Sequence, residues 1–92
     1  IGDYVRAEEH IDGAIRLRPY MANAWKYKGR LQYARGAATE ARDSFVRTLA
    51  LEPLDLPVYG ELIDLLRELG EPAEAERYLE LGLRMSSLTA AR

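Results

Sequence analysis

A period of 34 residues runs through this chain and constrains its fold more than any other feature. Residues of similar size and polarity recur at that interval in several columns, which chance matching does not explain. A fixed period of this length is typical of one supersecondary unit stacked in copies. The columns are Gly2, Gly36 and Gly70; Ala7, Ala41 and Ala75; Ile11, Phe45 and Leu79; Ile15, Leu49 and Leu83; Leu17, Leu51 and Met85; Pro19 and Pro53; and Trp25 and Tyr59.

The segments between these columns carry the apolar pattern of helices. In residues 39–51 the apolar side chains recur at steps of three and four, which places them on one stripe of an amphipathic helix. Residues 4–17 and 73–85 repeat that stripe. We therefore predict one amphipathic helix in each of these three segments.

Turn residues predict where the helices begin and end. The repeated glycines favour the left-handed backbone that closes a helix, so each predicts a helix-turn-helix junction. Asp3 and Thr39 are the predicted N-caps of the helices that follow. Because proline cannot continue a helical hydrogen-bond ladder, Pro19 and Pro53 are expected to end second helices. Pro72 suits the first turn of a helix, where its missing N–H has no partner to lose.

This helix-turn-helix unit resembles the tetratricopeptide repeat, whose pattern is W-x2-L-G-x2-Y, then A-x3-F, then P. The second unit departs from that pattern at Lys28 and Gln32, where the family has leucine and tyrosine. The first unit shows only the turn and second helix, in the run GDYVRAEEHIDGAIRLRP. The matching residues of the second unit are Trp25, Gly29, Ala41, Phe45 and Pro53.

The resemblance covers essentially the whole chain and implies an all-α fold, a right-handed solenoid of antiparallel helix pairs. We expect a single domain over residues 1–92, with five helices in about two and a half repeats. Residues 1–20 would be the second helix of a truncated first repeat, residues 22–55 the second repeat and residues 56–89 the third. Because each repeat buries its apolar face against a neighbour, we expect a slice of a longer array, or association through the end helices.

In proteins of this family the first helices of successive units line a concave face that usually holds a segment of a partner protein. The resemblance therefore implies a non-catalytic protein-protein interaction module, an adaptor or scaffold. Two alternatives stay open: a module that assembles with copies of itself, and the repeat region of a larger enzyme or regulator. An ordinary solvated surface is the competing interpretation for each residue on that face. The residues that the resemblance places there are Asn23, Lys26, Arg30 and Tyr33 of the second unit, with Pro57, Gly60, Asp64 and Arg67 of the third.

The net charge of −2 hides a strong segregation along the chain. Residues 14–50 carry a net charge of +6, and residues 51–82 carry −7. A nucleic-acid-binding domain normally shows a basic excess overall, so we predict no nucleic-acid partner. The basic stretch of one copy would attract the acidic stretch of another, which is a second route to self-association that salt should screen.

The reactive side chains predict no catalysis. His10 is the only histidine, the chain has no cysteine, and no second ligand stands at metal spacing from His10. No glycine-rich phosphate loop follows a predicted strand, and no serine sits in a nucleophile motif. Glu61, Asp64 and Glu68 share one helical face, which we interpret as a solvated acidic surface. We expect no enzymatic activity, no metal and no cofactor.

The hydropathy of the chain predicts no membrane insertion, because no run approaches the roughly 20 apolar residues that a membrane span needs. No basic start followed by an apolar core indicates a signal peptide. We expect a soluble chain, with the cytoplasm favoured over the periplasm. The partner and the biological process stay open at this stage.

Overall fold

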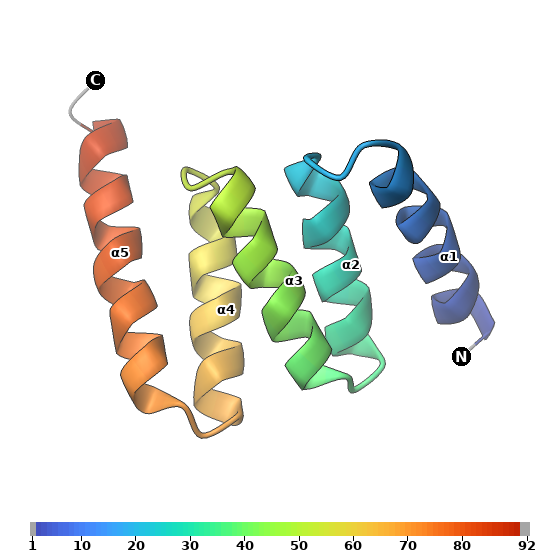
Figure 1. The fold of residues 1–92 in the computed structure, drawn as a ribbon. Coiled ribbons are helices and arrows are strands. Elements are labelled where there is room, and N and C mark those ends of the chain that lie inside the picture. The colour runs from blue at the N-terminus through green and yellow to red at the C-terminus, as the bar shows by residue number, and fades with distance from the viewer. Residues whose placement is uncertain (1, 91–92) are drawn as a thin grey trace.

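The computed structural model describes residues 2–90, which form five helices in one row (Figure 1). Neighbouring helices run in opposite directions, and the two ends of the chain lie at opposite ends of the row. No strand occurs within residues 2–90, so the predicted all-α repeat fold is confirmed. No helix in this range is long and apolar enough to cross a membrane. The helices are α1 (Gly2–Leu17), α2 (Ala22–Ala34), α3 (Ala38–Leu51), α4 (Leu56–Glu68) and α5 (Pro72–Ala90).

Two glycines close the first helices of the pairs, as predicted. Gly36 follows α2 with φ of 85°, and Gly70 follows α4 with φ of 74°. The residue after each glycine donates a backbone hydrogen bond of 2.8 Å to a carbonyl five residues earlier, Gln32 in one case and Leu66 in the other. This pattern is the Schellman motif, in which a left-handed residue lets the turn satisfy the last carbonyls of the helix.

The prediction of N-caps is wrong for Thr39 and Asp3. The helix α3 begins at Ala38, and Ala37 before it makes no side-chain capping hydrogen bond. Because the turn at Gly36 leads directly into the next helix, the carbonyl of Ala37 already accepts the N–H of Ala41 at 2.9 Å. Thr39 is therefore inside the helix. Asp3 lies in the first turn of α1, where its negative charge favours the positive end of the helix dipole.

Each proline turn is tied to the helix that follows it. The helices α1 and α3 end two residues before Pro19 and Pro53, as the sequence predicts. The indole N–H of Trp25 donates a hydrogen bond of 2.9 Å to the carbonyl of Pro19. The hydroxyl of Tyr59 donates one of 2.7 Å to the carbonyl of Pro53. The aromatic column of the 34-residue period thus makes the same contact in both units.

The core lies where α3, α4 and α5 meet, and α4 contributes most of it. In α1 no residue is buried, and in α5 only Ala75 is. The helix α4 is central in this group and buries apolar side chains against both neighbours. Its buried residues are Val58, Tyr59, Leu62, Ile63, Leu65 and Leu66.

A close approach joins α2 to α3 at Gly29. A Cβ built on Gly29 would lie 2.8 Å from Cε1 of Phe45, closer than side chains pack. Phe45 is only 2% exposed, so its ring has little room to move. The glycine of the repeat pattern is therefore required here by the aromatic ring facing it.

Candidate partner-binding face

Three of the predicted partner-binding residues contact α4 from within the same chain. Lys26, Arg30 and Tyr33 stand one helical turn apart along α2 and share one side of it. Each reaches an acidic side chain of α4 or of the residue before it. We call these three contacts the α2–α4 ladder: Lys26 with Asp55, Arg30 with Glu61 and Tyr33 with Glu68.

The first contact uses a residue that would otherwise cap a helix. Asp55 occupies the N-cap position of α4 but makes no capping hydrogen bond with its side chain. Its carboxylate accepts instead from Nζ of Lys26 at 2.9 Å. The two side chains are 17% and 13% exposed, so water screens this pair less than the other ion pairs of the face.

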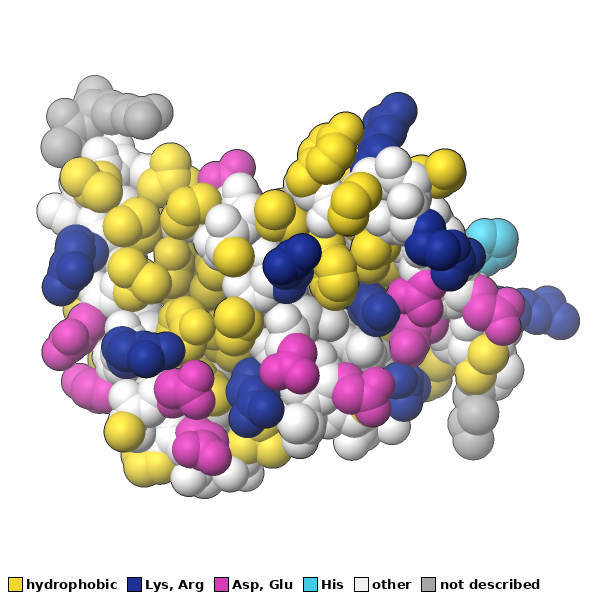
Figure 2. Space-filling view, viewed as in Figure 1, with side chains coloured by type: hydrophobic (Ala, Val, Ile, Leu, Met, Phe, Trp, Pro, Cys, Tyr) yellow, Lys and Arg dark blue, Asp and Glu magenta, His cyan; other side chains and the backbone are white. Residues whose placement is uncertain are grey.

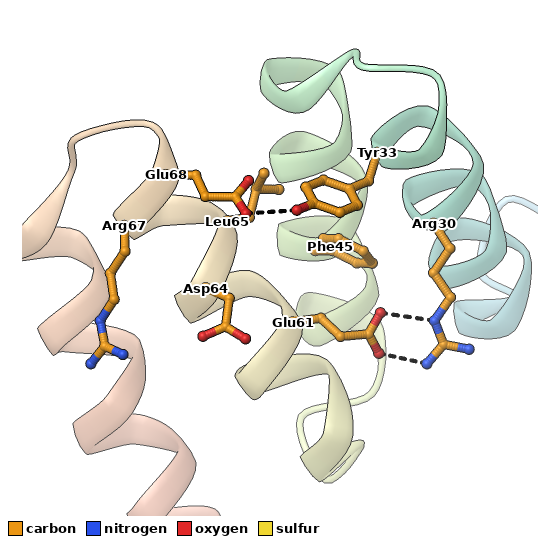
Figure 3. A pocket seen from close by; sticks show the side chains of 8 residues that line it. All are labelled: Arg30, Tyr33, Phe45, Glu61, Asp64, Leu65, Arg67 and Glu68. Carbon is orange, nitrogen blue, oxygen red and sulfur yellow. Dashed lines mark hydrogen bonds and ion pairs between the residues drawn. The ribbon is translucent and has the colours of Figure 1, made fainter.

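The second contact is bidentate. Arg30 donates from Nε to Glu61 at 2.8 Å and from its terminal nitrogen at 2.5 Å (Figure 3). The hydrogen bonds to Glu61 raise the pKa of Arg30 above its ordinary value, so the guanidinium stays charged. Both side chains are partly exposed, and such a pair contributes about 0–1 kcal/mol to stability. Its main consequence is to hold the Arg30 side chain against α4.

The third contact joins a phenol to a carboxylate. The hydroxyl of Tyr33 donates to Glu68 at 2.7 Å. This hydrogen bond raises the pKa of Tyr33, because ionised tyrosine would lose the bond and face a negative charge. The negative charge of Asp64 acts in the same direction.

The raised pKa of Tyr33 gives a pH prediction. In the Glu68→Gln variant we expect the pKa of Tyr33 to fall toward the ordinary tyrosine value of about 10. NMR titration of the tyrosine Cζ signals measures it, with Glu80→Gln on α5 as the control that leaves it unchanged. Since the folded pKa is raised, the contact stabilises the fold below pH of about 10 and is lost as pH rises through the folded pKa. An unchanged Tyr33 signal in Glu68→Gln would contradict the contact.

Between the second and third contacts lies a cavity of about 470 Å³. Phe45 from α3 stands between the two contacts, so apolar surface lies behind the polar rim (Figure 3). We call this side of the molecule, with the ladder and the cavity, the α2–α4 face. The lining residues are Arg30, Tyr33, Phe45, Glu61, Asp64, Leu65, Arg67 and Glu68.

The structure brings together four of the eight residues that the sequence places on the partner-binding face, and Pro57 and Gly60 are exposed on α4 outside this group. Arg30, Tyr33, Asp64 and Arg67 line the cavity. Lys26 lies outside the lining, and Asn23 is exposed near the start of α2. Their role in binding a partner stays a prediction. Phe45, Glu61 and Glu68 also line the cavity, although the sequence did not predict them as parts of this face.

Residue spacing contained a signal for the two carboxylates of this group. Glu61 and Glu68 are seven residues apart on one helical side, and α2 carries its cations and Tyr33 at the matching steps. Phe45 gave no such signal, because its column also fits a core residue of α3.

The other reactive side chains form no second site in residues 2–90. His10 is exposed on α1. Within this range no three histidine, aspartate or glutamate side chains gather as metal ligands. Lys28, which replaces an apolar residue of the repeat pattern, pairs with Asp12 at 2.7 Å and stays at the rim.

Comparison with known proteins finds likeness in structure only. No protein-family model matches the chain, and no curated protein sequence matches it. A crystal structure of MamA superimposes with a TM-score of 0.91 and 20% identity, over 98% of this chain and 53% of that one. A second MamA crystal structure superimposes with a TM-score of 0.86 and 20% identity, over 96% of this chain and 48% of that one. The MamA MSR-1 C2 structure superimposes with a TM-score of 0.82 and 21% identity, over 95% of this chain and 50% of that one.

The chain therefore spans about half the length of the MamA chains that it matches. At this level of identity the likeness concerns the fold. MamA is of tetratricopeptide type, and the 34-residue period and the paired helices agree with it. The chain thus has the fold of a tetratricopeptide-type repeat protein.

Proposed function

We propose that the chain is a protein-interaction module, an adaptor or scaffold without catalysis of its own, that holds a segment of a partner protein on the α2–α4 face. The observation that carries this proposal is the cavity of about 470 Å³ between α2 and α4. Its volume lies within the roughly 300–1,000 Å³ range of pockets that bind ligands. It combines apolar surface with polar groups, as binding sites in proteins do.

Peptide display tests this proposal without a known partner. We expect selection of random peptides on the immobilised chain to enrich binders whose addition shifts the backbone amide signals of Arg30, Asp64 and Leu65. Signals of Arg47 and Glu80, which do not line the cavity, serve as the control. Binders that shift only these control signals would overturn the assignment of the face.

Charge reversal of Lys26 and Arg30 is a poorer test of the same proposal. Arg30 pairs with Glu61 of the third unit, and Lys26 pairs with Asp55, the residue before α4. Reversal would place like charges together in the α2–α4 ladder and so weaken the packing of the two units. Loss of partner binding in that variant would therefore not distinguish a damaged face from a damaged fold.

A second candidate function, self-assembly, is favoured by the exposed apolar surface beside α5. Leu49 and Leu83 occupy the same column of the period, yet Leu49 is 6% exposed and Leu83 is 63% exposed. Leu49 lies in the core cluster that contains α4. Leu83 lines an open apolar groove between α4 and α5, with Leu56 and Ile63 of α4 on its other side. Figure 2 shows hydrophobic side chains gathered between α4 and α5. We propose that this surface can take the end of a second copy.

Sedimentation velocity tests the second candidate. We expect Leu83→Glu to lower self-association of the chain, because association would bury the new charge in the apolar groove between α4 and α5 without a partner. Leu54→Glu, at a 39% exposed leucine in the turn before α4, is the matched control and should leave association unchanged. Association that vanishes in high salt but survives Leu83→Glu would instead assign it to the segregated charges.

A further inference from the structure

We propose that the cavity of the α2–α4 face accepts a cationic side chain, arginine or lysine, of the bound partner segment. This inference rests on the proposed function, since it names the chemistry of the segment held on that face. It differs from what the charge segregation of the sequence suggests, since Lys26 and Arg30 lie in the basic stretch of residues 14–50.

The cations of α2 are already occupied inside the chain. Arg30 forms its bidentate pair with Glu61, and Lys26 pairs with Asp55. An acidic side chain of a partner would have to displace a carboxylate that α4 holds at hydrogen-bond distance. The positive charges of Lys26 and Arg30 are therefore neutralised by carboxylates of the same chain in the absence of a partner.

Negative charge remains on the cavity wall after these two ion pairs are counted. Glu68 accepts a hydrogen bond from the neutral hydroxyl of Tyr33, so its charge is not cancelled. Asp64 is exposed and has no ion-pair or hydrogen-bond partner among residues 2–90. Arg67 is the remaining cation of the lining, and its side chain points away from the two ladder contacts (Figure 3). Asp64 and Glu68 both line the cavity, so a cation that enters it meets uncancelled negative charge.

The apolar part of the lining suits the stem of such a side chain. Phe45 and Leu65 form the floor of the cavity but are only 2% and 1% exposed, so the ring of Tyr33, which is 46% exposed, supplies most of the apolar contact. Arginine and lysine bury their methylene stems on apolar surface and place their charged heads over aromatic faces. The chain already uses this contact elsewhere, with Arg30 lying 5.8 Å from the centre of the Tyr27 ring and Arg47 lying 5.5 Å from that of Trp25.

Other occupants fit this lining less well. An acidic side chain would be repelled by Asp64 and Glu68 at short range. An apolar side chain would cover the rim and take water from the carboxylate of Asp64 without giving it a partner, which is unfavourable. A cationic side chain alone satisfies both the apolar wall and the unpaired carboxylate.

Three alanine pentapeptides with blocked ends test the inference: one with a central arginine, one with norleucine and one with glutamate. Each is titrated into the 15N-labelled chain at low salt. We expect the arginine peptide to shift the amides of Asp64, Leu65 and Glu68, with an affinity at least about tenfold above that of the other two. Addition of salt should weaken this binding.

One pair of variants makes the test specific for the carboxylate. Asp64→Asn should lower the affinity for the arginine peptide about two- to fivefold, since one partly exposed charge pair is lost. Glu76→Gln, at an exposed carboxylate of α5 outside the cavity, should leave it unchanged. Equal effects of the two variants would overturn the role of Asp64.

The outcomes separate this inference from the proposed function. If the norleucine or glutamate peptide binds the same residues as tightly as the arginine peptide, the cationic preference is wrong and the α2–α4 face remains the binding face. If the display-selected peptides and all three pentapeptides leave the amides of Asp64, Leu65 and Glu68 unshifted, both proposals fail.

Discussion

Replacing Leu49 by alanine is expected to lower the free energy of unfolding by about 2–5 kcal/mol. The same change at Leu83 should lower it by less than about 1 kcal/mol. The two leucines hold one position of the 34-residue period, and their helices differ in what packs over them. Leu49 is 6% exposed in the core cluster, while Leu83 is 63% exposed. Truncation leaves a cavity only where neighbouring atoms surround the side chain.

Urea denaturation followed by circular dichroism measures both changes at low protein concentration, where association through α5 is minimal. The midpoint should move strongly for Leu49→Ala and little for Leu83→Ala, with an unchanged slope. Comparable losses in the two variants would show that Leu83 is buried in solution. In that case the experiment should be repeated over a range of concentrations, because burial by a second copy depends on concentration.

Replacing Gly29 by alanine is the second prediction with a large expected effect. A methyl group there would lie within 2.9 Å of two atoms of the Phe45 ring. Overpacking of this kind costs about 1–3 kcal/mol. Alanine gains about 1 kcal/mol over glycine in helix propensity, which offsets part of that cost. We expect a net loss of stability, measured by urea denaturation.

Gly60→Ala is the matched control, because Gly60 also lies within a helix and a Cβ built on it meets nothing within 4 Å. It should raise stability by up to about 1 kcal/mol. A double-mutant cycle then isolates the ring: in the Phe45→Leu background, Gly29→Ala should become neutral or stabilising. The third unit has a side chain larger than alanine, Ile63, at the position of Gly29, where it faces a leucine, Leu79, at the position of Phe45. Destabilisation that persists in the Phe45→Leu background would exclude the ring as the cause.

The repeat period predicted the helices because their ends depend on local chemistry. Gly36 and Gly70 need a left-handed backbone wherever the rest of the chain lies, and a proline ends a helix in any context. The N-cap at Thr39 was predicted wrongly for a related reason. The Schellman turn at Gly36 sets the start of α3 by itself, so the first residue that could cap is Ala37.

The α2–α4 ladder was harder to predict, because its partners are 29 to 35 residues apart. A periodic pattern says which side of a helix a residue occupies, but not which residue of the next unit it meets. The charge segregation contained part of the answer, since Lys26 and Arg30 lie in the basic stretch and their partners in the acidic one. The sequence suggested attraction between copies. The fold uses some of the same charges to join successive units, and attraction between copies stays a prediction.

The hydrogen bonds from Trp25 to Pro19 and from Tyr59 to Pro53 have a mechanical consequence. Each bond spans the short connection between two units and fixes its backbone to the first turn of the following helix. These hydrogen bonds therefore restrict the rotation of one unit relative to the next about the connection. The α2–α4 face is therefore preorganised before a partner segment binds, so the module loses little conformational entropy on binding.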